Sequence, residues 1–134
     1  MASGTCALLW RIAPPADRVS YLILLLAAAI VGVMASDHAI RETGLKDPSV
    51  VVIDEWLGQG VALLAAPHSW LGAGLAFVFF RVFDILKPPP VSLLERAPGG
   101  IGVMLDDVGA GLLAALCLHF LFLFLFLPFP GGGR

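Results

Sequence analysis

Long apolar runs separated by short polar breaks dominate the chain, and the runs have the lengths of membrane helices. The clearest run covers residues 19–36, whose few polar members are small or hydroxyl-bearing. At 1.5 Å per residue this run forms a helix of about 27 Å, close to the thickness of the hydrocarbon layer. We therefore predict a membrane-spanning helix over 19–36 and a polar connector over 37–49.

The apolar stretch 56–80 admits two interpretations. It is long enough for one span, but Pro67, His68 and Ser69 interrupt its middle. We favour a helical hairpin of two short helices, each about 16 Å long, which enters the bilayer and turns back. A hairpin places the residues before and after the stretch on the same side of the membrane, whereas a single span places them on opposite sides.

The last third of the chain predicts a helix end, a loop and a final long helix. Pro88, Pro89 and Pro90 end the preceding helix, because proline lacks the backbone N–H and disfavours helix in the residue before it. After a glycine-rich loop, Asp106 or Asp107 is expected to cap a helix that runs to Leu127. The glycines at 109 and 111 predict close packing of this helix against a neighbour.

Composition identifies the environment of these helices. With 59% hydrophobic and 13% charged residues, a soluble domain would expose large apolar patches. We therefore predict an all-α, polytopic integral membrane helical bundle that forms one domain over 1–134, with the lipid bilayer as its partner. The net charge of −2 and the lack of a basic tract argue against nucleic-acid binding.

Half of the ten acidic residues lie at the edges of the apolar segments. They are Asp54, Glu55, Asp84, Asp106 and Asp107. With the hairpin, all of them meet on one side of the membrane, where their mutual repulsion is relieved by a divalent cation. Ligands with oxygen alone predict Mg²⁺. Asp37, at the end of the first span, is a further candidate metal ligand.

Basic residues accompany these carboxylates. Arg81, Asp84 and Lys87 are spaced three apart, so they share a helix face up to the prolines. Phosphoryl transfer to water needs positive charge on the phosphate oxygens, a metal ion and a carboxylate that orients the water. The chain contains residues suited to all three tasks.

The distribution of basic residues predicts the orientation in the membrane. The side that carries the acidic residues has five basic residues, which are Arg41, Lys46, Arg81, Lys87 and Arg96. The opposite side has three, which are Arg11, Arg18 and Arg134. This bias predicts that the site faces the cytoplasm.

Other interpretations of the acidic residues stay open at this point. Each carboxylate taken alone is also suited to a helix cap or a helical ion pair. Acidic residues within membranes also line ion paths, so the alternative is a non-catalytic membrane protein or a divalent-cation transporter. A transport path places its acids near the bilayer midplane, whereas hydrolysis of a lipid headgroup requires them at the interface.

Three sequence blocks resemble the motifs of the phosphatidylglycerophosphatase A family. They are VVIDEWLGQ from Val51, FRVFDILKP from Phe80 and GGIGVMLDDVGAG from Gly99. The resemblance covers about residues 31–116. It implies Mg²⁺-dependent hydrolysis of phosphatidylglycerol phosphate to phosphatidylglycerol and phosphate, in glycerophospholipid biosynthesis. It also implies a multi-pass protein of the bacterial inner membrane whose active site faces the cytoplasm.

The same resemblance implies roles for particular residues. Asp54, Glu55, Asp84, Asp106 and Asp107 correspond to the metal-binding and acid/base set, and Arg81 and Lys87 to the contacts with phosphate. The segment 1–18 departs from the family, since it keeps only Gly4 and Thr5 of a longer motif and lacks a hydrophobic segment. Thr5 is therefore a weaker candidate for a phosphate contact. A phospholipid phosphotransferase is disfavoured because its multi-aspartate helix pattern is missing.

Overall fold

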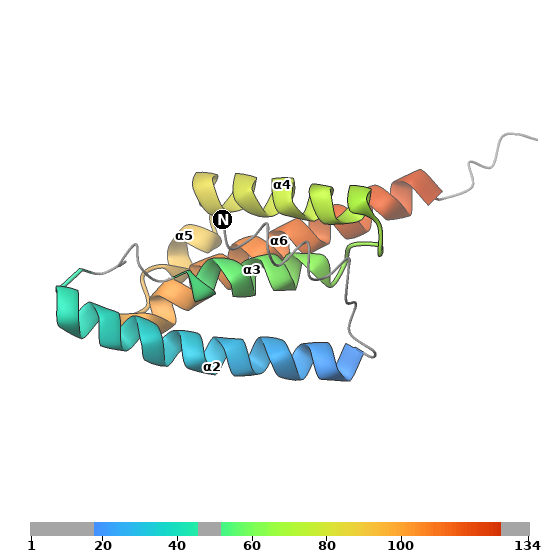
Figure 1. Cartoon of the computed structure of the whole chain (residues 1–134). Coiled ribbons are helices and arrows are strands. Elements are labelled where there is room, and N and C mark those ends of the chain that lie inside the picture. The colour runs from blue at the N-terminus through green and yellow to red at the C-terminus, as the bar shows by residue number, and fades with distance from the viewer. Residues whose placement is uncertain (1–17, 46–51, 127–134) are drawn as a thin grey trace, which may run out of the picture.

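The computed structural model describes residues 18–45 and 52–126, and within these ranges it contains helices and no strands. The helices are α2 (Arg18–Thr43), α3 (Ile53–Leu63), α4 (Trp70–Leu86), α5 (Val91–Leu94) and α6 (Gly99–Phe126). Figure 1 shows an elongated bundle in which α3 lies between α2 and α4, with α6 packed along it. The predicted all-α fold class is confirmed for this part of the chain.

Helices α2 and α6 are both long and apolar enough to cross a membrane. Large apolar side chains cover their outer faces. The exposed ones are Val19, Leu22, Ile23, Leu24, Leu26, Ile30, Val31, Met34, Ile101, Leu112, Leu116, Phe120, Leu123, Phe124 and Leu125. Surfaces of this kind are stable in lipid and unfavourable in water. These two helices indicate a membrane protein.

The first of them is longer than expected. α2 continues past Ser36 to Thr43, so the prediction of a polar connector from residue 37 is wrong. The polar side chains of this last stretch do not stop the helix, because they reach the surface from one end of the span. The helix ends where Gly44 takes a positive φ of 69° and donates its N–H to the carbonyl oxygen of Ile40 at 2.8 Å.

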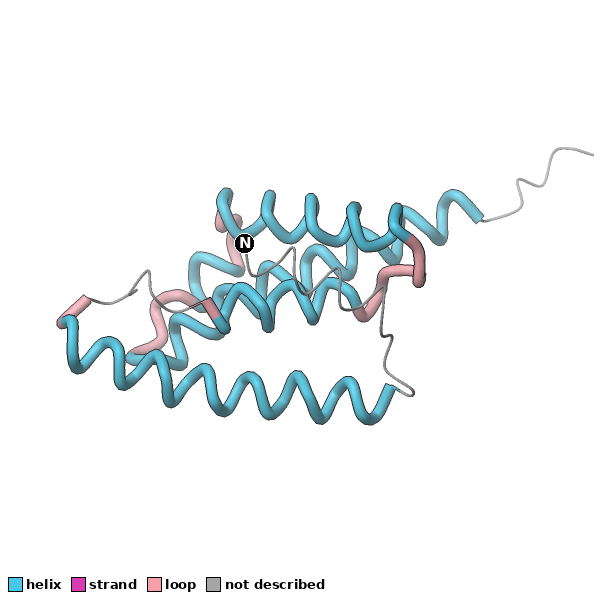
Figure 2. The backbone as a smooth tube through the Cα atoms, in the orientation of Figure 1, coloured by secondary structure: helices cyan, strands magenta, loops and turns pink. Residues whose placement is uncertain are grey.

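The hairpin predicted over 56–80 is confirmed, but α4 has 17 residues and is longer than the short helix expected there. α3 ends at Leu63, and α4 begins after Ser69, whose hydroxyl oxygen accepts a hydrogen bond from Gly72 N at 3.0 Å. The turn that joins them is one of the loops in Figure 2. At the open end of the hairpin, Arg81 Nη1 lies 2.6 Å from Glu55 Oε1, so the two helices are antiparallel neighbours.

The end of α4 follows the prediction from the prolines. The helix stops at Leu86, and Lys87 adopts a left-handed φ of 42° while its N–H donates to Phe83 O at 2.9 Å. The loop beyond contains the single-turn helix α5, which the sequence pattern did not predict. Val91 of α5 is fully buried against the bundle, so burial of this side chain stabilises a turn too short to form alone.

The start of α6 corrects a prediction. The helix begins at Gly99, so neither Asp106 nor Asp107 is its N-cap. Its first turn is capped from another helix, because Gly100 N donates to Asp37 Oδ1 at 2.6 Å. Gly100 also lies against the backbone of α2 at Val33, where a side chain would not fit. Asp106 and Asp107 therefore lie inside the helix, on the face turned toward the bundle.

Close contact between α3 and α6 holds the bundle together, as Gly111 predicted, whereas Gly109 lies against Val91 and Leu94 of α5. A Cβ atom added at Gly111 would overlap the backbone carbonyl of Gly58, and one added at Gly58 would overlap that of Asp107. Small residues such as glycine allow helix backbones to approach this closely. The approach places the first turn of α3 beside Asp107.

We expect Gly111→Ala to lower the stability of the protein by about 1–3 kcal/mol, because the added methyl group forces α3 and α6 apart. Thermal unfolding in a mild detergent measures the change. Gly74→Ala is the matched control, since a Cβ atom at Gly74 meets nothing within 4 Å. That control is expected to keep or raise the melting temperature. Equal melting temperatures for the two variants would contradict the close approach.

Candidate active site

The hairpin and α6 bring the predicted carboxylates together at one end of the bundle. Asp54 and Glu55 lie in the first turn of α3, Asp84 in the last turn of α4, and Asp106 and Asp107 on α6. The Asp107 carboxyl shares a hydrogen bond with that of Asp84 and interacts electrostatically with Asp54 and Asp106. Three helices thus contribute acidic side chains to one carboxylate cluster.

The carboxylates of the cluster differ in how deeply they are buried. Asp106 and Asp107 are only 6% and 7% exposed, whereas Asp54, Glu55 and Asp84 are half-buried. Buried carboxylates are stable only when other groups pair with them. Asp106 pairs with Lys87 and Asp107 with the carboxyl of Asp84, so the burial of these two adjacent acids is more than a helix cap requires.

Arg81 is the first of two basic residues at the rim of the cluster. Its Nη1 lies 2.6 Å from Glu55 Oε1 and 3.1 Å from Asp84 Oδ2. The Arg81 side chain keeps 38% of its surface exposed, so a ligand approaching from outside can reach it. One guanidinium nitrogen contacts both carboxylates, and the guanidinium has further N–H groups that can donate to a ligand.

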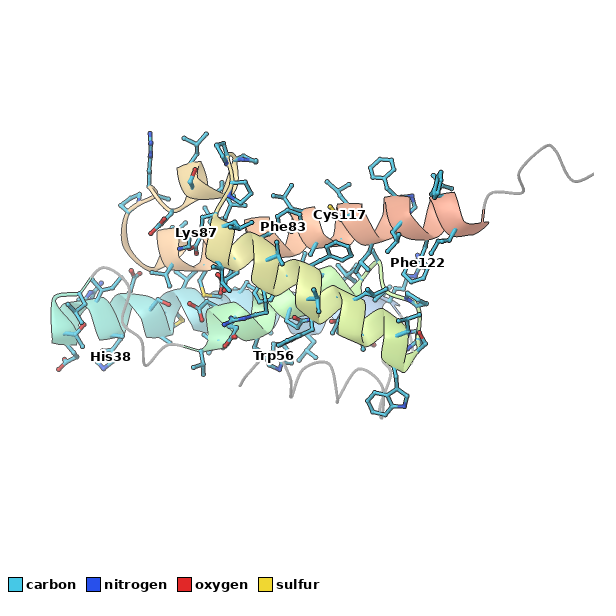
Figure 3. All side chains as sticks on the ribbon, turned by 90° about the horizontal axis from the view of Figure 1, so that it is seen from above. His38, Trp56, Phe83, Lys87, Cys117 and Phe122 are labelled. Atoms are coloured by element: carbon cyan, nitrogen blue, oxygen red, sulfur yellow. The ribbon has the colours of Figure 1, made fainter. Side chains whose placement is uncertain are left out.

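Lys87 is the second basic residue, and it contacts α6. Its Nζ lies 2.7 Å from Asp106 Oδ2 and 3.7 Å from Glu95 Oε1. Figure 3 shows Lys87 where the end of α4 meets α5 and α6. The predicted shared helix face holds for Arg81 and Asp84 but not for Lys87, because the left-handed turn carries Lys87 off the helix. Glu95 was not predicted, since it lies in a loop with no periodic pattern.

Asp37 is a described candidate that the structure does not bring to the carboxylate cluster. Asp37 bonds to Gly100 at the start of α6, about 9 Å along this helix from Asp106. It stabilises the helix start, and its role as a metal ligand stays a prediction. Thr5 lies outside the described residues.

The geometry of the described residues says little about the predicted metal site. Among the described residues, no three His, Cys, Asp or Glu side chains are arranged as a preformed metal site. Mg²⁺ does not require one, because it keeps several waters and uses one or two carboxylates together with substrate phosphate. The adjacent carboxyls of Asp84 and Asp107, which offer oxygen alone, suit that coordination.

Comparison of the chain with known proteins identifies a family. A family model described as phosphatidylglycerophosphatase A matches residues 1–122, a wider range than the motifs alone. No solved structure matches the chain.

Three curated proteins are similar to the chain. Phosphatidylglycerophosphatase A of Escherichia coli strain K12 is 32% identical over 103 residues, which cover 75% of this chain and 60% of that protein. The protein of the same name from Haemophilus influenzae is 35% identical over 98 residues, or 72% and 60%. A putative phosphatidylinositol-3-phosphatase of Bacteroides thetaiotaomicron is 45% identical over 76 residues, or 54% and 48%. The chain thus matches at most 60% of the length of these relatives.

Proposed function

The chain belongs to the phosphatidylglycerophosphatase A family, and we propose that it hydrolyses phosphatidylglycerol phosphate to phosphatidylglycerol and inorganic phosphate. The observation that carries the proposal is the carboxylate cluster with Arg81 and Lys87 at its rim. Phosphate monoesters are anions that need cations around their oxygens and a carboxylate beside the attacking water. The candidate site supplies both kinds of group.

We propose that Arg81 and Lys87 bind the phosphate oxygens. The planar guanidinium of Arg81 matches two oxygens of a phosphate and can keep Glu55 as a partner at the same time. Lys87 contacts the cluster through Asp106 of α6. Together with Arg81, which contacts Glu55 and Asp84, it orients the phosphorus toward the carboxylates.

The carboxylates position and deprotonate the attacking water. Its oxygen forms the new bond to phosphorus while the bond from phosphorus to the glycerol oxygen breaks, and that oxygen takes up a proton. We propose Asp54, Asp84 and Asp107 as the acceptors, since the carboxyl group of Asp107 interacts with those of Asp84 and Asp54. A protonated neighbour within the cluster supplies the proton to the leaving oxygen.

We propose Mg²⁺ as the cofactor, held by Asp84 and Asp107, with Asp54 as a further ligand. When bound, Mg²⁺ adds positive charge next to the phosphate oxygens and lowers the pKa of a bound water. The protein contributes to metal binding by keeping two carboxylates adjacent, through the close packing of α3, α4 and α6.

We further propose a multi-pass protein of the bacterial inner membrane, with the site facing the cytoplasm. Arg41, Arg81, Lys87 and Arg96 lie toward the end of the bundle that carries the site, and Arg18 begins α2 at the other end. This distribution agrees with the excess of basic residues on cytoplasmic sides. Asp54 and Asp84 lie at helix ends, which suits an interfacial phosphatase better than a transport path through the midplane.

The direct test is phosphate release from phosphatidylglycerol phosphate in detergent micelles. We expect release with Mg²⁺ that falls to background with EDTA and returns when Mg²⁺ is added in excess. Phosphatidylinositol 3-phosphate is the second substrate to compare, because one relative carries the name of a phosphatase for that lipid. Absence of release from both lipids by folded protein would contradict the proposal and favour cation transport.

A further inference from the structure

Gln59 is a buried polar side chain that the proposed chemistry does not use. It is fully buried on α3, in a stretch where every residue from Leu57 to Leu63 is buried. Among the residues that the structure describes, neither its Nε2 nor its Oε1 has a hydrogen-bond partner. An amide left unpaired in an apolar interior is unfavourable, most of all in a membrane. Such a group calls for a ligand that completes its hydrogen bonds.

The position of Gln59 relates it to the candidate site. It follows Glu55 by four residues, so it lies one turn further along the same side of α3, about 6 Å away. Glu55 contacts Arg81 of α4, which is proposed to bind phosphate. Gln59 therefore lies one turn deeper than the phosphate contact, on the side of α3 that carries Glu55.

The donor and acceptor atoms of the amide limit the kinds of ligand group that can pair with it. Nε2 donates and Oε1 accepts, so the side chain complements a group that does both. The head group of phosphatidylglycerol phosphate contains such a group, a hydroxyl on the glycerol between its two phosphates. This hydroxyl is a few bonds from the reacting phosphorus, a separation comparable to one helical turn.

We propose that Gln59 is a specificity-determining residue that hydrogen-bonds to the hydroxyl of a polyol head group. The inference rests on the proposed function, because it assumes that the reacting phosphate lies at Arg81. The head group then enters from the site end along the side of α3 that carries Glu55 and Gln59. Lipids whose head group has no hydroxyl leave the amide unpaired and bind less tightly.

Binding of two lipids to the purified full chain in mixed micelles tests this inference without requiring hydrolysis. Phosphatidylglycerol has the head-group hydroxyls, and phosphatidylethanol has the same phosphodiester without them. We expect the wild-type chain to bind phosphatidylglycerol about three- to tenfold more tightly, the effect of one net hydrogen bond. Gln59→Met is expected to bind both lipids equally. Leu63→Met, a buried control one turn further along α3, is expected to keep the preference.

Two results would overturn the inference: equal binding of both lipids by the wild-type chain, or an unchanged preference in Gln59→Met. Melting temperatures without lipid check the fold, and Gln59→Met should melt no lower than wild type because it removes an unpaired polar group. Gln59→Asn keeps an amide on a shorter side chain, and we expect it to retain part of the preference. If the wild-type chain prefers phosphatidylglycerol but has no phosphatase activity, the result would support the proposed role of Gln59 and contradict the proposed hydrolysis.

Discussion

Asp107→Asn is expected to lower kcat for phosphatidylglycerol phosphate by about a thousandfold, because a bound metal contributes several kcal/mol to such reactions. Asp107 is buried and shares a hydrogen bond with Asp84. Asparagine has the same size, but its amide neither balances the charge of Mg²⁺ nor accepts a proton from water. Phosphate release measured over a range of Mg²⁺ concentrations should show both the lower kcat and a higher requirement for the metal.

Asp84→Asn is expected to have an effect of the same order, and the double variant should be little worse than either single one. Residues that act as a unit lose their function together, so their effects are not additive. Glu42→Gln is the control, because Glu42 is an exposed carboxylate in the last turn of α2, away from the cluster. Activity above a tenth of wild type in Asp107→Asn would show that this carboxylate is not part of the machinery.

Features that depend on local backbone chemistry were predictable from the sequence. The hairpin followed from the interruption at Pro67, His68 and Ser69, and the end of α4 followed from the three prolines. Proline restricts the backbone wherever it occurs, so these predictions need no knowledge of the tertiary structure. The hairpin in turn fixed which carboxylates meet, and this is why the cluster could be predicted from the sequence.

Features that depend on contacts between distant segments were not predictable. The start of α6 is set by Asp37, which is 63 residues from Gly100 in the sequence. The local sequence pattern alone therefore predicts the cap at Asp106 or Asp107. Lys87 reaches Asp106 only because its backbone is left-handed, and a non-glycine residue in that conformation has no sequence signal. Glu95 depends on the packing of α5 and was missed for the same reason.

Arg81→Met is expected to lower kcat/KM by about a hundredfold, the effect of removing one charged group that stabilises a transition state. The substitution removes the proposed phosphate contact and leaves Glu55 and Asp84 without their cation. Arg81→Lys should recover only part of the loss, because an ammonium group cannot hold two carboxylates and a phosphate with the geometry of a guanidinium. Initial rates at several lipid concentrations in mixed micelles separate the change in KM from that in kcat.

A stability effect does not account for a loss of this size. The Arg81 side chain is 38% exposed, and partly exposed ion pairs contribute at most about 1 kcal/mol to stability. Arg81→Met should therefore melt close to wild type while its inhibition by inorganic phosphate, the product, weakens in parallel with the rise in KM. Arg96→Met removes an exposed cation from the same end of the bundle and should leave both values unchanged. If Arg81→Met kept wild-type inhibition by phosphate, Arg81 would be an ion-pair partner that joins α4 to α3, and Lys87 would remain as the proposed phosphate contact.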